Sequence, residues 1–248
     1  EQIKNIEFLL PPFAEQRRIV AKLDAAFVEI DKALAVSISQ KDKIEQLNAA
    51  CLSSTLSEHT ERWKAVQLGE VAKALGGNGF PKKYQSNTVK PIPFYKVGDM
   101  NSAGNEKEMS IANNYVDETD LKEMRAKWHP TGTIVFPKIG GAISTNKKRI
   151  LKSKAAFDNN VMGVIPNTAL ILPEYLYKLF LSLDLYELSN KAALPSITNS
   201  AVEQIEIRLP SLSEQERVII KLDIALAEIE KAAIVLNKKQ VNYEALKS

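Results

Sequence analysis

A lysine-rich stretch in the middle of the chain holds the residues best suited to bind a ligand. From 138 to 154 it reads KIGGAISTNKKRILKSK, with six basic residues and no acidic one. Ammonium groups bind phosphates, while the amides and hydroxyls between them reach phosphates or base edges. The stretch therefore predicts a loop that contacts DNA, with a solvated hairpin as the alternative. Its candidate contacts are Lys138, Ser144, Thr145, Asn146, Lys147, Lys148 and Arg149.

A second and shorter candidate is the stretch GGNGFPKKY from Gly76 to Tyr84, in which Lys82 and Lys83 lie beside an aromatic residue. The charge of the surrounding region agrees with a DNA contact. Residues 62–209 hold 20 Lys and Arg against 14 Asp and Glu, a net charge of +6, whereas the flanking segments together carry −3. The positive charge of the chain is therefore concentrated in its middle.

The patterns that mark common catalytic and metal sites are missing from the sequence. It has no GxxxxGK[ST] phosphate-binding loop and no complete GxGxxG. His59 and His129 lie far apart, without a cysteine or carboxylate at metal-ligand spacing. An acid–acid–lysine nuclease triad stays open as an alternative, because its members are dispersed along a chain. We predict a non-catalytic binding protein without a metal site.

Composition is that of an ordinary globular protein. The chain has 248 residues, of which 45% are hydrophobic and 25% charged, enough for one large domain or two small ones. Its single cysteine, Cys51, excludes a disulfide framework and favours a reducing cytoplasm. We find no charged-then-apolar leader and no segment apolar enough to span a membrane, so we predict a cytoplasmic protein.

A long internal repeat flanks the basic region. LPPFAEQRRIVAKLDAAFVEIDKALA begins at Leu10, and LPSLSEQERVIIKLDIALAEIEKAAI begins at Leu209. The two align without a gap at an offset of 199 residues, a period too long for a solenoid. The repeat therefore predicts two copies of one element on either side of a separate domain.

Both copies are predicted to be helices of a coiled coil. Glu15 and Glu214 lie in the expected first turns, and Ser213 with Glu216 forms a candidate capping box in the second copy. Apolar residues recur in alternating steps of three and four, which is a coiled-coil seam. The predicted seam contains Val20, Leu23, Phe27, Ile30, Leu34 and Ile44, then Ile219, Leu222, Leu226, Ile229, Ala233, Leu236 and Tyr243, with interruptions at Ser37, Lys41 and Gln240.

Between the helices the pattern is that of a mixed α+β domain. Strand-like runs occur at Ile92–Val97, Thr133–Ile139 and Asn160–Ile165, and helical stretches at Glu118–Ala126 and Pro173–Leu188. We divide the chain into a tail of a preceding domain (1–9), a long helix (10–61), the α+β domain (62–209) and a second helix (210–248). Short connections predict that the helices pack antiparallel as a stalk with the domain at one tip.

At the repeated residues the chain resembles the specificity subunit of type I restriction–modification systems. That family's conserved regions carry a proline followed by a Glu-Gln-x-Arg helix, as in LPPFAEQRR and LPSLSEQER. The middle of the chain is similar to the family's target recognition domain. The similar positions are Trp63, Leu68–Val71, Ile92–Phe94, Gly98–Met100, Lys138–Gly140, Lys148–Arg149, Phe157–Val161 and Leu194–Thr198. A full-length subunit has two such domains, so this chain resembles one half, or a half-subunit that forms a homodimer.

The resemblance implies recognition of one half of a split target in double-stranded DNA, with the helices as a ruler for the gap. It implies adenine methyltransferase and motor–endonuclease subunits as partners, which use S-adenosylmethionine, ATP and Mg²⁺, and no cofactor in this chain. It adds Asn159, Asn160, Ser196 and Thr198 as DNA contacts. Candidate methyltransferase contacts are Arg18, Glu29, Arg217 and Glu228, unless these form only a solvated coiled-coil surface.

Two other classes of function stay open. One is a coiled-coil scaffold without sequence-specific DNA binding, and the other is a stand-alone nuclease, which the missing motifs disfavour. The DNA sequence read and the length of its gap depend on loop geometry and are not predicted.

Overall fold

The computed structural model describes residues 10–58 and 60–247. The predicted tail at residues 1–9 and His59 lie outside the described residues. The chain divides into two compact units. The unit formed by residues up to 50 and from 225 onward is called the helical unit here, and residues 51–224 are called the sheet unit.

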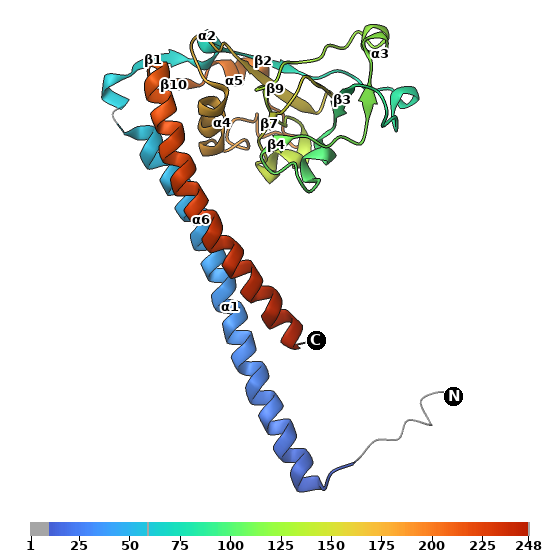
Figure 1. The fold of residues 1–248 in the computed structure, drawn as a ribbon, viewed down its shortest axis with the longest axis vertical. Helices are drawn as coiled ribbons and strands as arrows, with labels where there is room; N and C mark the ends of the chain where they lie inside the picture. Colours follow the sequence, from blue (N-terminus) through green and yellow to red (C-terminus); the bar gives the residue numbers. More distant parts are fainter. Residues whose placement is uncertain (1–9, 59, 248) are drawn as a thin grey trace. The chain divides into compact units, whose positions relative to one another are not determined.

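Two long helices, α1 (Phe13–Ser57) and α6 (Leu212–Lys247), supply the helical unit (Figure 1). Lys247 Nζ donates to Asp31 Oδ1 at 2.5 Å. A cavity later along α1 is lined by Ile44 of α1 and Leu236 of α6. Since later residues of α1 meet earlier residues of α6, the helices pack antiparallel, which confirms the prediction.

Part of the predicted coiled-coil seam is buried between the two helices. In α6 the buried residues Leu222, Ile229 and Leu236 recur every seven positions, as in a coiled coil. Ser37 was predicted to interrupt the seam, but it is only 4% exposed and lies within it.

The beginning of α1 lacks the predicted partner. Val20, Leu23 and Phe27 are 54, 49 and 38% exposed. They precede Asp31, which pairs with Lys247 at the end of α6, so α6 does not cover them. The prediction of a seam along this part of α1 is therefore wrong for the pairing with α6.

The N-cap of α6 also differs from the prediction. The helix begins at Leu212, so the capping box falls on Ser211 and not on Ser213. Ser211 N donates to Glu214 Oε2 at 3.0 Å, and Glu214 N donates to Ser211 Oγ at 3.4 Å. The observed box therefore pairs Ser211 with Glu214, two positions earlier than the predicted pair Ser213 and Glu216.

The described residues of the sheet unit form three sheets, with strand orders β2–β9–β6–β7–β4, β5–β3–β8 and β1–β10. The pairs β3·β8 and β4·β7 are parallel and the others antiparallel. The strands are β1 (Lys64–Gln67), β2 (Ala72–Gly76), β3 (Ile92–Tyr95), β4 (Glu108–Met109), β5 (Tyr115–Val116), β6 (Ile134–Pro137), β7 (Arg149–Leu151), β8 (Ala156–Phe157), β9 (Val161–Pro166) and β10 (Glu206–Leu209). The shorter helices are η2 (Thr60–Arg62), α2 (Leu68–Val71), η3 (Lys82–Tyr84), η4 (Val97–Asn101), α3 (Glu118–Glu123), η5 (Gly140–Thr145), α4 (Pro173–Ser182) and α5 (Asn199–Glu203).

Both faces of the five-stranded sheet are buried at β6. All four residues of this strand are buried, and successive side chains of a strand point to opposite faces. Phe136 of β6 stacks on Phe180 of α4, with ring centroids 5.3 Å apart. Val135 belongs to a second cluster that contains Phe157. Gly163 makes room for that ring, since a Cβ there would lie 2.4 Å from Phe157 Cζ. This packing holds the strands from which the candidate site loops leave.

The α+β class and the pairing of two long helices are confirmed. The three predicted strand runs correspond to β3, β6 and β9, and the two helical stretches to α3 and α4. Helix α4 ends at Ser182 and not near Leu188, because Leu183 takes an extended backbone conformation. Asp184 then accepts a hydrogen bond from Tyr186 N at 2.8 Å and begins a turn.

Candidate nucleic-acid interface

Three predicted site segments meet at Lys138, although up to 58 residues separate them in sequence. Lys138 N donates to Asn160 O at 2.9 Å, and Ile197 N donates to Lys138 O at 2.9 Å. Ser196 pairs with Ile139 in an isolated β-bridge. The fold thus brings the end of β6, the turn before β9 and the segment before α5 onto one surface.

The turn at Asn159 and Asn160 is ordered by Asp158, as the sequence suggested. Asp158 Oδ1 accepts a hydrogen bond from Asn160 N at 3.0 Å. Burial raises the pKa of the Asp158 carboxyl, while the bonds from Asn160 oppose that shift. Both asparagines remain exposed, although Asn160 Nδ2 also donates to Asp158 Oδ2 at 3.4 Å.

The Gly76–Tyr84 loop packs directly against this turn. A Cβ on Gly77 would lie 2.1 Å from Asp158 O, so only glycine fits there. A Cβ on Gly76 would lie 2.7 Å from Lys138 Nζ. The two stretches that the sequence offered separately therefore form one surface.

The stretch Lys138–Lys154 divides into exposed and internal residues. Ser144 and Thr145 are exposed in η5. Thr145 Oγ1 donates to Ala142 O at 2.7 Å. Lys147 Nζ donates to Asn101 Oδ1 of η4, which ties the two loops together.

Asn146 and Lys148 make internal hydrogen bonds that connect the segment after η5 to the segment after α4. Asn146 lies in the left-handed region at φ 52°, and its Oδ1 accepts from Leu185 N at 2.9 Å. Lys148 is 2% exposed, and its Nζ donates to Asn146 Oδ1 at 2.7 Å and Leu183 O at 2.6 Å. Burial lowers the pKa of Lys148 to about 8. A lysine enclosed in this way does not reach a phosphate, and we leave Lys148 out of the proposed contacts as a correction.

Arg149 and Thr198 also have internal partners. The guanidinium of Arg149 donates to Lys148 O at 2.8 Å and Met100 O at 3.1 Å, and burial lowers its pKa. Thr198 Oγ1 caps α5 by accepting from Ala201 N at 3.1 Å. These side chains position loops, so we leave them out of the proposed contacts as well.

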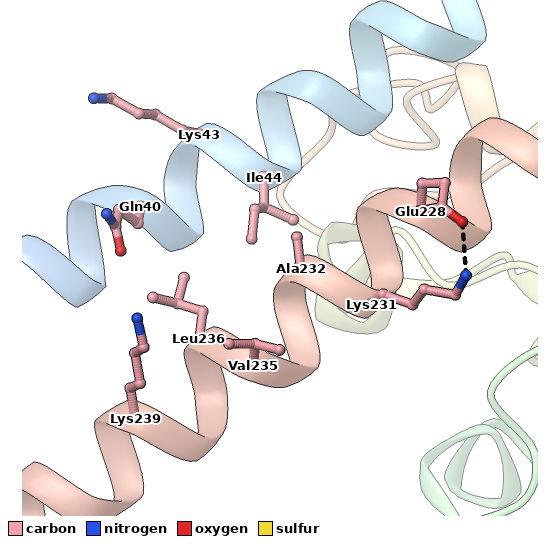
Figure 2. Close-up of a pocket in the computed structure, with 9 residues that line it drawn as sticks. All are labelled: Gln40, Lys43, Ile44, Glu228, Lys231, Ala232, Val235, Leu236 and Lys239. Carbon is pink, nitrogen blue, oxygen red and sulfur yellow. Dashed lines mark hydrogen bonds and ion pairs between the residues drawn. The ribbon is translucent and has the colours of Figure 1, made fainter.

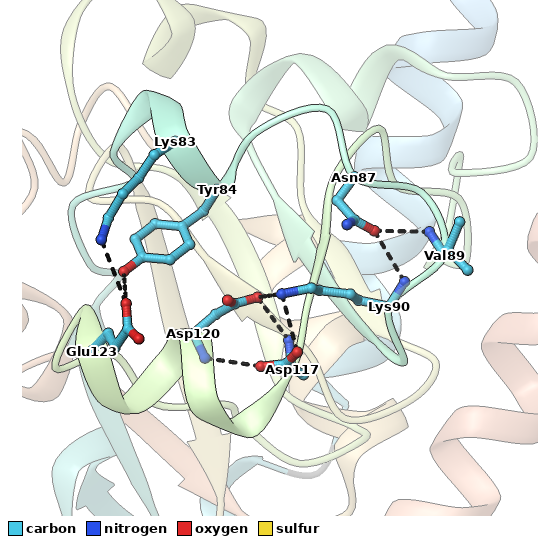
Figure 3. Close-up of polar contacts among 8 residues, drawn as sticks. All are labelled: Lys83, Tyr84, Asn87, Val89, Lys90, Asp117, Asp120 and Glu123. Atoms are coloured by element: carbon cyan, nitrogen blue, oxygen red, sulfur yellow. Dashed lines mark hydrogen bonds and ion pairs between the residues drawn. The ribbon is translucent and has the colours of Figure 1, made fainter.

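Lys82 and Lys83 lie on η3 and differ in their surroundings. Figure 3 shows Lys83 and Tyr84 directed at Glu123 of α3, with distances of 3.4 Å from Lys83 Nζ and 2.5 Å from the Tyr84 hydroxyl to Glu123 Oε2. The hydrogen bond from Tyr84, followed by that from Lys83, lowers the pKa of Glu123. Within the part of the chain that the structure describes, no carboxylate lies within ion-pair distance of Lys82. The ammonium group of Lys82 is therefore more available to bind a phosphate than that of Lys83.

Sequence reasoning missed further cations of this surface. Lys96 Nζ donates to Gln85 Oε1 at 2.8 Å and lies 5.4 Å from the centroid of the Phe80 ring. Phe80 in turn stacks on Phe94 at 3.8 Å. Lys96 follows β3 as a single lysine, so no run of basic residues marked it.

The predicted partner contacts lie on the two long helices. In the helical unit Glu29 pairs with Lys32 at 2.8 Å, and Glu228 pairs with Lys231 at 2.6 Å, so the repeat preserves one ion pair. Arg18 pairs with Glu15 at 2.5 Å. Arg217 lies near Glu214, whose pKa is lowered by hydrogen bonds from Ser211 and, to a smaller extent, by the charge of Arg217.

Glu228 lies at the edge of an apolar groove between the helices. The groove has a volume of about 570 Å³. Figure 2 shows Ile44 of α1 and Ala232, Val235 and Leu236 of α6 around it, with Lys43 and Lys239 at its rim. Val235 is 56% exposed, so part of this apolar surface is open to solvent.

Residues 10–58 and 60–247 contain neither a cluster of metal-ligating side chains nor a helix that could span a membrane. No group of three or more His, Cys, Asp and Glu side chains in these residues could hold a metal ion. No helix in the same residues is both long and apolar enough to cross a membrane.

The family model of the type I restriction modification DNA specificity domain matches residues 60–236. The chain belongs to this family. The match covers the whole five-stranded sheet and most of α6. It confirms the resemblance carried by the repeated Pro–Glu-Gln helices.

Similar proteins agree with this family of specificity domains. A putative type I restriction enzyme specificity subunit of Haemophilus influenzae is 23% identical over 227 residues, which are 90% of this chain and 56% of that protein. A chain from a study of complex assembly and conformational transition of the type I R-M system has a TM-score of 0.78 at 19% identity, covering 96% of this chain and 58% of that one. The HsdS subunit of Thermoanaerobacter tengcongensis has a TM-score of 0.57 at 20% identity, covering 95% and 57%. The chain thus spans little more than half the length of these relatives.

Proposed function

We propose that the sheet unit reads one half of a split DNA target as the non-catalytic specificity component of a type I restriction–modification enzyme. The observation that supports this most directly is the meeting of Lys138, Asn160 and Ser196 on one surface of a specificity-family domain. In such an interface the amides and hydroxyls read base edges in the major groove. The lysines supply affinity that depends on salt and not on sequence.

The proposed contacts have exposed or partly exposed side chains, and Asn146, Lys148, Arg149 and Thr198 are left out because of their internal hydrogen bonds. The proposed contacts are Lys82, Lys83, Lys96, Lys138, Ser144, Thr145, Lys147, Asn159, Asn160 and Ser196. S-adenosylmethionine, ATP and Mg²⁺ would be bound by partner subunits.

We assign to the two long helices the role of fixing the distance between the two halves of the DNA target. Half-sites on one face of B-DNA lie about 34–36 Å apart per helical turn. A helix of the length of α1 is about 65 Å long at ~1.5 Å per residue, so it spans more than one turn. The groove beside Glu228 is the proposed docking site for a methyltransferase helix, since its open apolar floor and charged rim suit an amphipathic helix.

The start of α1 is the proposed docking face for a second recognition domain. In the sheet unit, the start of α6 packs on the domain core through Val218, and Asp223 pairs with the buried Lys178 at 2.5 Å. The repeat puts Ile19 and Asp24 at the equivalent positions of α1, where Ile19 is 40% exposed. An apolar and an acidic side chain thus recur at the same positions of α1, and among the described residues no second recognition domain covers them.

Photo-crosslinking in the host tests this docking face. A photoreactive residue at Ile19 should capture a peptide from a second recognition domain, identified by mass spectrometry. The same residue at Val218 is the matched control and should capture the chain's own α4. Capture of nothing at Ile19, with efficient capture at Val218, contradicts the docking proposal.

Gel-shift titration tests the DNA-reading function itself. The purified chain with its methyltransferase subunit should shift duplex DNA from a mixed pool, and repeated selection should enrich one sequence with a fixed gap. Binding should weaken as salt rises, because phosphate contacts release counterions. A scaffold protein would give no salt-dependent shift and no enrichment.

A further inference from the structure

A cavity beside the proposed reading surface has the chemistry of a nucleotide-binding site. Its volume is about 440 Å³. Lys73 and Gly76 of β2 form one wall, and Arg125, Lys127 and Trp128, which follow α3, form another. We call it the Trp128 cavity.

The positive charge of the Trp128 cavity is not neutralised. Its lining has three cations, Lys73, Arg125 and Lys127, and no carboxylate. In the described residues no Asp or Glu lies within ion-pair distance of any of them. About half of the other lysines of the sheet unit have such a partner, for example Lys107 with Glu174 at 3.1 Å. The cavity therefore favours an anion.

The rest of the lining is mostly apolar, with Asn78 and His129 as its uncharged polar residues. Trp128 is 43% exposed and presents an indole ring beside Leu75 and Ile165. Lys154 Nζ lies 5.2 Å from the centroid of that ring. His129 is neutral at neutral pH, because burial lowers its pKa to about 4. Such a surface packs against a sugar or a base and does not repel it.

The walls are held in place by their own contacts. Lys127 N donates to Asn78 Oδ1 at 3.4 Å, which links the segment after α3 to the loop after β2. His129 N donates to Ala155 O at 2.7 Å on the other side. Arg125 has φ 52°, a strained conformation for a residue other than glycine, as often found at functional sites.

The cavity adjoins the proposed DNA surface. Gly76 lines it, and Lys138 Nζ lies 2.7 Å from the position that a Cβ on Gly76 would take. We propose that the Trp128 cavity binds a phosphate and the adjoining deoxyribose of the DNA strand that flanks the bases read. This inference rests on the proposed function.

The test replaces Lys73, Arg125 and Lys127 by Gln. At about 0.1 M salt, affinity for duplex DNA should fall about 10-fold or more, equally for preferred and random sequences, and the slope of log K against log salt should shrink by about 2 to 3. The matched control replaces the ion-paired Lys107, Lys152 and Lys191 by Gln, which changes the net charge by the same amount. Lys191 has φ 52°, as Arg125 does, so each variant replaces one residue in the left-handed region. The control should bind nearly as the parent protein does.

Quenching of tryptophan emission by iodide gives a second measurement. The chain has two tryptophans, and Trp63 is only 8% exposed, so iodide reports mainly on Trp128. Saturating duplex should protect Trp128, whereas dAMP without DNA should not. Equal affinities of the triple variant and the control, or unprotected Trp128 at saturation, would overturn the inference. Protection of Trp128 by dAMP alone would mean that the cavity binds a free nucleotide and not the DNA strand. If neither the parent protein nor the control bound DNA, both the proposed function and this inference would be wrong.

Discussion

Replacement of Gln215 by Ala should lower the free energy of unfolding by about 2–4 kcal/mol. Gln215 is fully buried, and its side chain joins the start of α6 to the domain. Its Nε2 donates to Leu170 O at 2.9 Å and Pro210 O at 3.0 Å, and its Oε1 accepts from Leu172 N at 2.8 Å. Alanine would leave buried backbone groups unpaired, each at a cost of about 1–3 kcal/mol. Urea denaturation followed by circular dichroism measures the loss.

The repeat provides the control for this prediction. Gln16 is the equivalent residue of α1, and among residues 10–58 and 60–247 its Nε2 donates only to Pro11 O, at 2.8 Å. Gln16→Ala should cost less than about 1 kcal/mol in this chain. Equal losses in the two variants would mean that Gln215 does not anchor α6 to the domain, and the comparison of the two helix starts would fail.

Replacement of Lys82, Lys138 and Lys147 by Ala should weaken binding to every duplex by roughly 10²- to 10³-fold at about 0.1 M salt. Each lysine that neutralises one phosphate contributes about 0.9 to the slope of log K against log salt, so the slope should fall by about 2 to 3. The ratio of affinities for preferred and random sequences should change little, because lysines on phosphates do not read bases. Fluorescence anisotropy at several salt concentrations measures these quantities.

The controls for this triple variant separate a local contact from a general loss of charge. Lys22→Ala, Lys32→Ala and Lys231→Ala together remove the same charge from exposed positions of the helical unit. That variant should keep the parent's salt slope. If both triple variants lose affinity alike, the surface around Lys138 is not the DNA contact.

The sequence predicted the fold well where local pattern and repeat agreed. The 199-residue offset identified both long helices, and the three strand runs followed from β-branched and aromatic residues between turns. The extent of the seam was not predictable. Val20 and Leu23 have the spacing of seam residues whether or not a partner helix covers them. The structure shows where the pairing of α1 with α6 stops, because Lys247 at the end of α6 pairs with Asp31.

Site prediction from composition found the correct region but not the orientation of each side chain. Lys147 and Lys148 are neighbours in a basic run, yet only Lys148 is enclosed, by acceptors on Asn146 and Leu183. Lys73 and Arg125 were missed because neither lies in a run of basic residues. Each is an isolated cation in sequence, and they meet only because the segment after α3 folds beside β2.

The central claim is that this chain chooses the DNA sequence that its partners modify. Sequencing that detects N6-methyladenine, in the host strain with and without the gene, tests it most directly. The account predicts methylation at one split motif with a fixed gap, and loss of that methylation when the gene is deleted. Methylation of the same motifs at the same level in both strains would contradict it.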